Sequence, residues 1–197
     1  MQKNLVVFDF DGTITFKDSL AEMIKFQKGI LSFWLGVIIL SPVLVLFKLG
    51  FIPNQRAKEF VLAYFFKNDD WKQFQQKCTR FSLEKLPQIV KTSALECIQK
   101  HQEAGDRVMI VTASAENWLS AWCEKMKLEL IATRLEIKND KLTGKIEGTN
   151  CFGLEKVRRL TQKVDLKSFD KIYVYADSKG DKELLDVADY PFYKSFK

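Results

Sequence analysis

The segment that decides the fold of this chain is Leu5-Val6-Val7-Phe8-Asp9-Phe10-Asp11-Gly12-Thr13, close to the amino terminus. Its first four residues form a short, continuous apolar run, which is typical of a parallel strand covered by helices on both faces. Functional side chains of such sheets gather at the carboxyl ends of the strands. Asp9 and Asp11 stand at this end, and Gly12 permits a sharp bend of the backbone. We therefore expect the chemistry of the protein to begin here.

Two further apolar runs have the same form. One is Arg107-Val108-Met109-Ile110-Val111, which leads into Thr112-Ala113-Ser114, and the other is Lys171-Ile172-Tyr173-Val174-Tyr175, which leads into Ala176-Asp177. Between and after the runs, helical patterns occupy residues 93–104, 115–127, 154–163 and 181–187. Strands that alternate with helices predict an α/β fold with a doubly wound, Rossmann-like parallel sheet.

The remaining segments do not follow this alternation. Residues 132–137 and 142–146 are predicted to form a β-hairpin or a pair of short strands at one edge of the sheet. Residues 18–86 show helical patterns only, and they separate the first strand from the rest of the sheet. We therefore expect a catalytic core of residues 1–17 and 87–197, with an all-helical cap, residues 18–86, inserted into it.

The composition indicates a folded protein and narrows its partners. The chain has 197 residues, of which 47% are apolar, and its formal net charge of +6 favours anionic partners. Neither a Lys/Arg tract nor a zinc-finger spacing accompanies this charge, so nucleic acid is not an expected partner. The four cysteines lack CxxC spacing and the first residues lack the pattern of a signal peptide, which together predict a cytoplasmic protein.

The two acids of the opening segment suit phosphoryl transfer. Asp9 and Asp11 are two residues apart at a strand end, so both project from one turn. The carboxylate of Asp9 can attack phosphorus and form an acyl phosphate, which divides one difficult displacement into two easier ones. The carboxyl group of Asp11 can protonate the leaving oxygen and later accept a proton from the attacking water.

An anionic nucleophile and an anionic substrate repel each other, so this chemistry needs positive charge. Asp177 and Asp181 follow the last strand and can complete an oxygen-rich site for Mg²⁺ together with the opening acids. The hydroxyl of Thr112 and the backbone N–H groups of the turn at Ala113 can bind phosphate oxygens. Lys156 begins a predicted helix and offers a point positive charge.

These residues resemble the four motifs of the haloacid dehalogenase superfamily of phosphatases: the DxDGT opening, the strand-end Thr or Ser, the distant Lys and the DxxxD acids. The resemblance covers essentially the whole chain, and a cap inserted directly after the first motif is similar to that of the branch containing phosphoserine phosphatase. It implies that Asp9 is the nucleophile and Asp11 the acid/base. It also implies that Asp9, the carbonyl of Asp11 and Asp177 bind Mg²⁺, with Asp181 in the outer shell of the metal.

Three segments resemble a bacterial group within that branch that includes phosphatidylglycerophosphatase C. They are residues 133–136, 150–157 and 175–181. Two positions depart from the usual pattern. Ala176 stands where Gly usually precedes the metal-binding acid, which should alter only the turn. Gly180 stands where phosphoserine phosphatases carry Asn, which weakens the case for phosphoserine as the substrate.

The longest uncharged stretch of the chain runs from Gly29 to Phe47, nineteen residues, and is long enough to span a membrane. A single crossing would nevertheless place Asp9 on one side of a bilayer and Lys156 on the other. Pro42 interrupts the stretch and removes a helical hydrogen bond, which favours two shorter helices or one kinked helix. The catalytic pattern therefore excludes a simple crossing.

Lys25, Lys28, Lys48, Arg56 and Lys58 flank this stretch and can meet anionic headgroups. Our hypothesis is that the cap docks as a peripheral element on the cytoplasmic membrane face and presents a lipid phosphate to the catalytic acids. The alternative is that the stretch forms the interior of the cap or is buried against a second subunit. The oligomeric state stays open.

Two other functions use similar residues. A soluble metabolite phosphatase or phosphotransferase would enclose a small polar substrate under the cap, with Asp18, Arg56, Arg80 and Ser114 as candidates for substrate contact. A phosphate-receiving response regulator also combines Asp, Thr and Lys on a doubly wound sheet. Its phosphorylated Asp, however, lies in the middle of the chain and no cap follows its first strand, so we set this function aside.

Overall fold

The computed structural model describes residues 4–196, and its centre is a five-stranded sheet in the order β3-β2-β1-β6-β7. All neighbouring strands of this sheet pair in parallel. The bounds are β1 Asn4–Phe8, β2 Arg107–Ala115, β3 Glu129–Thr133, β6 Lys171–Ala176 and β7 Tyr190–Tyr193. The three strands that the apolar runs predict, β2, β1 and β6, are neighbours at the middle of the sheet.

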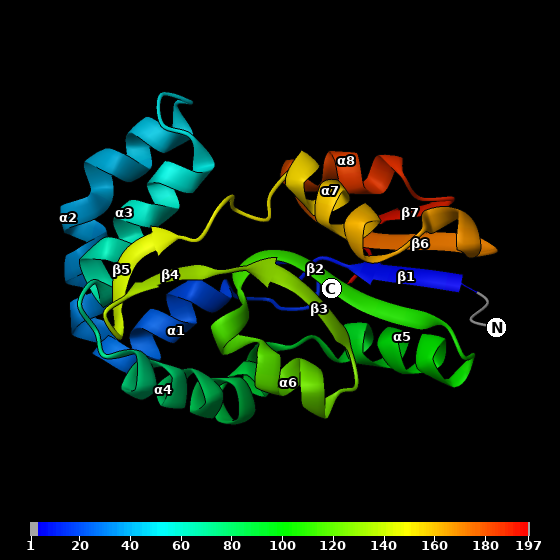
Figure 1. Ribbon diagram of the computed structural model, residues 1–197, viewed down its shortest axis with the longest axis horizontal. Helices are drawn as coiled ribbons and strands as arrows, with labels where there is room; N and C mark the ends of the chain where they lie inside the picture. The colour runs from blue at the N-terminus through cyan, green and yellow to red at the C-terminus, as the bar shows by residue number, and fades with distance from the viewer. Residues whose placement is uncertain (1–3, 197) are drawn as a thin grey trace.

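Helices cover both faces of the sheet (Figure 1). On one face lie α5, Thr92–Glu103, and α6, Ser120–Lys125; on the other lie α7, Leu154–Lys163, and α8, Lys182–Asp186. Alternate residues of β1 enter separate hydrophobic clusters, Val6 and Phe8 on one side and Leu5 and Val7 on the other. The predicted doubly wound α/β fold is therefore confirmed.

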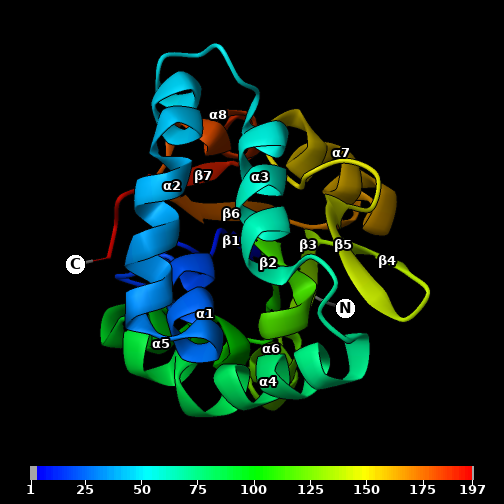
Figure 2. The same ribbon diagram turned by 90° about the vertical axis from the view of Figure 1, so that its left-hand side faces the viewer.

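The chain between β1 and α5 consists of helices, as the sequence patterns predict. They are α1 Ser19–Lys28, α2 Ile30–Lys48, α3 Asn54–Phe66 and α4 Trp71–Glu84, followed by a 3₁₀ turn, η1, Leu86–Ile89. Figure 2 shows α2 and α3 side by side at one end of the molecule, with α4 below them. Thr15, before this helical segment, and Val90, directly after it, form an isolated antiparallel bridge, so the chain enters and leaves the segment at neighbouring points. We continue to propose residues 18–86 as a cap.

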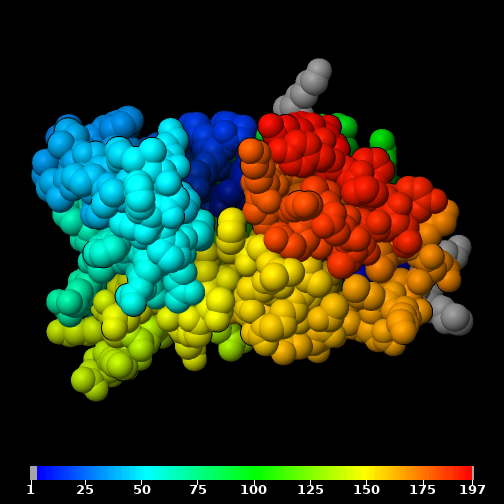
Figure 3. Space-filling model, turned by 90° about the horizontal axis from the view of Figure 1, so that it is seen from above, coloured from blue at the N-terminus to red at the C-terminus, as the bar shows by residue number. Residues whose placement is uncertain are grey.

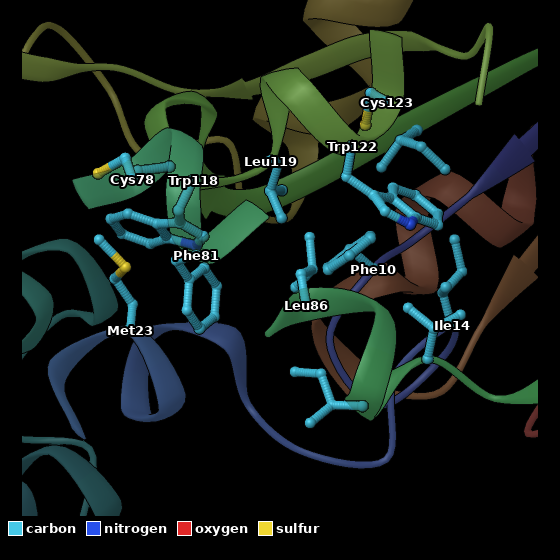
Figure 4. Packing of buried hydrophobic residues seen from close by; sticks show 14 of the residues in the cluster. Phe10, Ile14, Met23, Cys78, Phe81, Leu86, Trp118, Leu119, Trp122 and Cys123 are labelled. Atoms are coloured by element: carbon cyan, nitrogen blue, oxygen red, sulfur yellow. The ribbon is translucent and has the colours of Figure 1, made fainter. Parts of the chain in front are cut away.

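Packing between the helical segment and the sheet is continuous (Figure 4). Met23 of α1 and Phe81 of α4 belong to the same buried cluster as Trp118, which follows β2. All three side chains are at most 1% exposed. The α1 and α4 end of the segment is therefore fixed to the core, whereas α2 lies farther from it.

The stretch around Pro42 forms one helix, α2, so of the two expected forms the pair of shorter helices is wrong and a single helix is present. Proline at position 42 cannot donate a hydrogen bond to the carbonyl of Ile38, four residues earlier. The hydroxyl of Ser41 donates to that same carbonyl oxygen at 2.7 Å. A neighbouring side chain thus replaces the missing backbone donor, and the helix continues.

Three strand and helix predictions need correction. Residues 132–137 do not form one strand, because β3 ends at Thr133 and a separate strand, β4 Leu135–Lys138, follows. β4 pairs with β5, Lys141–Ile146, in a hairpin that forms its own two-stranded sheet and packs on α3. A Cβ on Gly144 would lie 2.4 Å from the Cα of Ala63, so β5 lies directly against α3. The hairpin is therefore attached to the helical segment and not to an edge of the main sheet.

The predicted helix over residues 115–127 is shorter than expected. β2 extends to Ala115 and is followed by a 3₁₀ turn, η2 Glu116–Trp118, before α6 begins. Two more such turns, η3 Leu166–Ser168 and η4 Lys179–Asp181, precede β6 and α8. The short edge strand β7 is not predicted from the sequence, because its aromatic residues follow a single helical turn and carry no apolar run.

Candidate active site

The site lies at the carboxyl ends of the three central strands. Phe8 of β1 pairs with Ile110 of β2 on one side and with Tyr175 of β6 on the other. Asp9, Thr112 and Asp177 follow these positions by one or two residues, so strand pairing brings three distant segments together. Asp9 is 6% exposed and Thr112 is 1% exposed, which places both in the floor of the site.

Lys156 connects two of the predicted acids. Its Nζ lies 2.5 Å from Oδ1 of Asp9 and 2.5 Å from Oδ1 of Asp181, and the residue is only 2% exposed. Burial alone would lower the pKa of Lys156, but the two carboxylates outweigh it and raise the pKa above its ordinary value. Burial raises the pKa of Asp9 to about 6 against the opposing effect of the Lys156 ammonium. The Lys156 ammonium therefore favours the ionised form of Asp9 against the effect of burial.

Asp9, Asp177 and Asp181 can each offer one carboxylate oxygen to a shared centre, and these oxygens lie within 4.8 Å of one another. Their orientation is supported by neighbours. Thr13 Oγ1 donates to Asp177 Oδ1 at 3.2 Å, and Ser178 Oγ donates to Asp181 Oδ2 at 2.5 Å. Three carboxylates in one cluster are an oxygen-only donor set of the kind that Mg²⁺ prefers. The residues present therefore fit a magnesium ion.

Gly12 has a steric role beside this cluster. Its φ of +82° lies in the left-handed region, and a Cβ at this position would lie 2.3 Å from Oδ2 of Asp177. No side chain fits there without moving the Asp177 carboxylate. Glycine is therefore required both by the turn after Asp11 and by the packing of Asp177.

The side chain of Asp11 points away from the acidic cluster and toward the first turn of α1. It accepts hydrogen bonds from the Ser19 backbone N–H at 2.7 Å, from Ser19 Oγ at 3.1 Å and from Ser114 Oγ. Trp118 Nε1 donates in turn to Ser19 Oγ at 3.1 Å. Burial, together with the charge of nearby Asp18, raises the pKa of Asp11 to about 7. Asp11 can therefore hold or release a proton near neutrality.

A cavity of about 370 Å³ opens above these residues. Figure 3 shows a recess between the helical segment and the carboxyl-terminal part of the core, where the chain after β1 is visible. The predicted residues that line the cavity are Asp9, Asp11, Asp18, Thr112, Ala113, Ser114, Lys156 and Asp181. Asp177 lies beside it, next to Gly12. The structure thus brings together all the catalytic, phosphate-binding and metal-binding candidates.

Three of the predicted substrate-contact residues have other positions or partners. Arg56 does not line the cavity; its side chain is 72% exposed and lies 3.9 Å from Glu59. Arg80 is also exposed and pairs with Glu84 at 3.4 Å. Ser114 does lie in the cavity, but its hydroxyl contacts Asp11. Ser114 therefore acts most directly on Asp11.

Lys58 reaches the cavity instead of Arg56. Positions 56 and 58 are about 200° apart around α3, since each helical residue turns by about 100°. Lys58 Nζ donates to the Ala113 carbonyl at 2.5 Å, so this lysine does not point outward as a flanking charge. Burial lowers its pKa against the opposing charges of Asp11 and Asp18. Sequence reasoning missed this role, and Ser19 and Trp118 likewise, because it depends on how the helices fold over the sheet.

Comparison with known proteins agrees with this geometry. Residues 6–186 match the family model of haloacid dehalogenase-like hydrolases. Protein CicA of Caulobacter vibrioides is 31% identical over 197 residues, covering 98% of this chain and 86% of CicA. The similarity extends to the helical segment as well as the core.

Two solved structures share the fold. A Bordetella pertussis protein of unknown function has a TM-score of 0.80 and 24% identity, covering 95% of this chain and 88% of that one. A phosphoserine phosphatase, solved as an analogue of its phospho-aspartyl intermediate, has a TM-score of 0.68 and 18% identity, covering 95% and 84%. Family match, fold and clustered acids lead to one conclusion: the chain belongs to the haloacid dehalogenase-like hydrolases.

Proposed function

We propose that this protein is a magnesium-dependent phosphomonoester hydrolase that works through an acyl phosphate of Asp9. The observation that carries this proposal is the contrast between two acids on one turn. Asp9 is held beside the Lys156 ammonium at 2.5 Å, whereas Asp11 is held by Ser19 and Ser114 and has a pKa of about 7. One acid is suited to attack and the other to proton transfer.

In the first step a carboxylate oxygen of Asp9 forms a bond to phosphorus while the bond from phosphorus to the ester oxygen breaks. Asp11 gives its proton to the departing oxygen, which leaves as an alcohol. In the second step Asp11 takes a proton from water as the water oxygen attacks phosphorus. The bond between Asp9 and phosphorus then breaks, inorganic phosphate leaves, and both acids return to their starting states.

The remaining residues reduce charge repulsion and hold the phosphoryl group. Lys156 neutralises Asp9 and the incoming phosphate, and the hydroxyl of Thr112 is free to donate because its oxygen accepts the Ser114 N–H at 3.0 Å. Asp9, the carbonyl of Asp11 and Asp177 would hold Mg²⁺, with Asp181 of the same acidic cluster in its outer shell, and the ion would supply positive charge for the transferred group. Asp181 also holds Lys156, whose Nζ lies 2.5 Å from its Oδ1.

The test is an Asp9→Asn variant with Asp140→Asn as its matched control. Asp140 is exposed and has a φ of 58°, a conformation that Asn also adopts readily. We expect Asp9→Asn to lower phosphate release by roughly 10⁴-fold and to remove acid-stable, hydroxylamine-labile phosphate from the protein. Asp140→Asn should retain both. Wild-type turnover in Asp9→Asn with a normal circular dichroism spectrum would refute the nucleophile.

The metal has a separate test. We expect EDTA to stop phosphate release and excess Mg²⁺ to restore it, because the phosphoryl group and three clustered carboxylates need a shared cation. Phosphate release that continues unchanged after chelation would remove the ion from the mechanism. Both measurements can use a soluble aryl phosphate.

For the substrate, we favour a lipid phosphate and a peripheral position on the cytoplasmic membrane face. Support comes from the cavity wall, where the apolar side chains of Leu20, Leu44, Phe47, Val61 and Phe152 stand above the acids. A soluble sugar phosphate or phosphoserine would leave these side chains facing water. Phosphate release from lysophosphatidate and phosphatidylglycerophosphate should exceed release from phosphoserine and sugar phosphates. Preference for the soluble esters would favour a metabolite phosphatase.

A further inference from the structure

α2 exposes apolar side chains along its whole length. Its mean hydropathy is 2.6, yet only 11% of its most apolar 18-residue window is buried. The exposed side chains include Leu31 at 84%, Ile38 at 69% and Leu35 at 55%. Leu49, which directly follows the helix, is 65% exposed. Monomeric soluble proteins rarely expose contiguous apolar patches beyond about 300–600 Å². Such a surface indicates a partner.

Most of the exposed apolar side chains lie on one side of the helix. At about 100° per residue, Leu31, Leu35 and Ile38 fall within about 60° of one another, whereas Gly36 and Leu40 lie nearly opposite. Gly36 is packed so closely that an added Cβ would lie 2.1 Å from Cζ of Phe65 on α3. We call the exposed side the outer face of α2 and define it as Leu31, Trp34, Leu35, Ile38 and Val45.

α2 is attached to the rest of the protein in a way that opposes a membrane crossing. It packs against α1 and α3, and its close contact with α3 lies near its middle, at Gly36. α3 carries Arg56, Lys58 and Glu59 and is itself packed on β5. Inserting α2 across a bilayer would either strip it from α3 or carry these charges into hydrocarbon, which is costly. The outer face can instead enter one leaflet while the inner face stays on the protein.

The charges near α2 favour an anionic surface. Between Glu22 and Glu59 the sequence contains Lys25, Lys28, Lys48, Arg56 and Lys58 and no acidic residue. Lys25 and Lys28 each pair with a carboxylate at 2.7 Å, with Glu22 and Asp69 as partners, and Lys58 lies in the cavity. Lys48, the last residue of α2, and Arg56, in the first turn of α3, are the exposed cations of this set. They would meet lipid phosphates near the cavity.

The outer face and the catalytic cavity are connected by the same helix. Leu44 and Phe47 line the cavity, and Phe47 is also 37% exposed, so it lies at the rim. Leu49 and Phe51, 65% and 74% exposed, continue the apolar surface beyond it. A lipid in the adjoining leaflet would have a path along apolar side chains toward Asp9.

We propose that the outer face of α2 docks flat on an anionic lipid bilayer and penetrates only the near leaflet, with the cavity rim at Phe47 against the headgroups. The docking itself follows from exposure and charge; its use for substrate delivery rests on the proposed phosphatase function. A second copy of this chain is the competing occupant of the face. Lys48 and Arg56, its exposed flanking charges, are both positive, and no acidic residue lies between Glu22 and Glu59, which disfavours pairing of this face with itself.

The first experiment is flotation of the full chain with vesicles of phosphatidylcholine alone or with 30% phosphatidylglycerol. We expect the wild-type protein to float with the anionic vesicles and Leu35→Glu/Ile38→Glu to lose at least about tenfold of this binding. The matched control, Leu83→Glu/Tyr193→Glu, makes the same charge change at exposed apolar residues away from α2 and should float normally.

Each variant is also assayed on a soluble aryl phosphate and by light scattering. We expect Leu35→Glu/Ile38→Glu to hydrolyse the soluble ester at the wild-type rate, because neither residue lines the cavity. Loss of flotation with retained hydrolysis supports docking, whereas hydrolysis absent from every protein would refute the phosphatase function and leave docking intact. Normal flotation of Leu35→Glu/Ile38→Glu, no flotation of the wild type, or a wild-type dimer that this variant dissociates would overturn the proposal.

The depth of α2 in the bilayer is measured by quenching of the fluorescence of Trp34, which is 55% exposed on the outer face. Vesicles carry lipids brominated either near the headgroup or deep in the acyl chain, and the signal of Trp34 is the difference between wild type and Trp34→Phe. We expect shallow bromines to quench Trp34 at least twice as strongly as deep ones. Equal or stronger quenching by the deep bromines would exclude a flat, single-leaflet position.

Discussion

The floor of the cavity and the outer face of α2 distribute charge in opposite ways. In the floor, Lys156 is only 2% exposed, and two carboxylates at 2.5 Å balance its charge. On the outer face, Leu31 is 84% exposed and no charged residue occurs between Gly29 and Phe47. Buried charges persist where the chain itself supplies their partners. Exposed apolar residues point to a partner outside the chain, and the difference distinguishes the proposed catalytic site from the proposed docking surface.

The largest expected effect on stability and turnover is at Lys156. Lys156→Met would leave Asp9 and Asp181 buried without their shared cation, which should destabilise the fold by about 3–5 kcal/mol and abolish turnover. Lys163→Met removes an exposed lysine that lies 3.3 Å from Glu129 and should cost less than about 1 kcal/mol. Urea unfolding in EDTA measures both. Equal stability of the two variants would show that the buried pairs contribute little.

The second effect concerns proton transfer by Asp11. Asp11→Asn keeps the shape of the side chain but cannot donate or accept the catalytic proton, so kcat should fall by about 10²–10⁴-fold. The wild-type rate should change around pH 7, where Asp11 titrates, and this change should be absent from the residual activity of the variant. The pH profile of each protein gives the answer. If the rate of Asp11→Asn changed around pH 7 in the same way as the wild-type rate, that titration would belong to another group.

The same pKa has a consequence for stability with a defined sign. Because the pKa of Asp11 is raised to about 7 in the fold and is about 3.9 in an unfolded chain, the native state binds more protons between these values. Its contribution to stability is present below about pH 4 and is lost as the pH rises toward 7. Asp11→Asn should therefore gain stability relative to wild type, on the order of 1–3 kcal/mol, between pH 5 and 8 in metal-free buffer. The free energy of unfolding is measured against pH for both proteins, and a constant difference between them from pH 4 to 8 would contradict the raised pKa.

The sequence predicts the floor better than the residues above it. Asp9, Thr112 and Asp177 end apolar runs, and parallel pairing of those runs necessarily brings their ends together. Lys156 was also predicted, from its place at a helix start. The position of the hairpin β4–β5 depends on contacts with α3 that no local pattern encodes. The hydrogen bond from Trp118 to Ser19 spans 99 positions and is likewise encoded by no local pattern.

Lys58 and Arg56 offer the smallest and most discriminating test. Both are cations on α3, but Lys58 contacts the Ala113 carbonyl in the cavity while Arg56 is 72% exposed. Lys58→Met should lower kcat/KM by about tenfold, equivalent to about 1.4 kcal/mol, because an ammonium beside the phosphate-binding turn is lost. Arg56→Met should leave kcat/KM on a soluble ester unchanged and instead weaken flotation with anionic vesicles by a few-fold. If Arg56→Met instead lowered kcat/KM and Lys58→Met weakened flotation, Arg56 would belong to the proposed catalytic site and Lys58 to the proposed docking surface, on the opposite sides of α3 from those proposed.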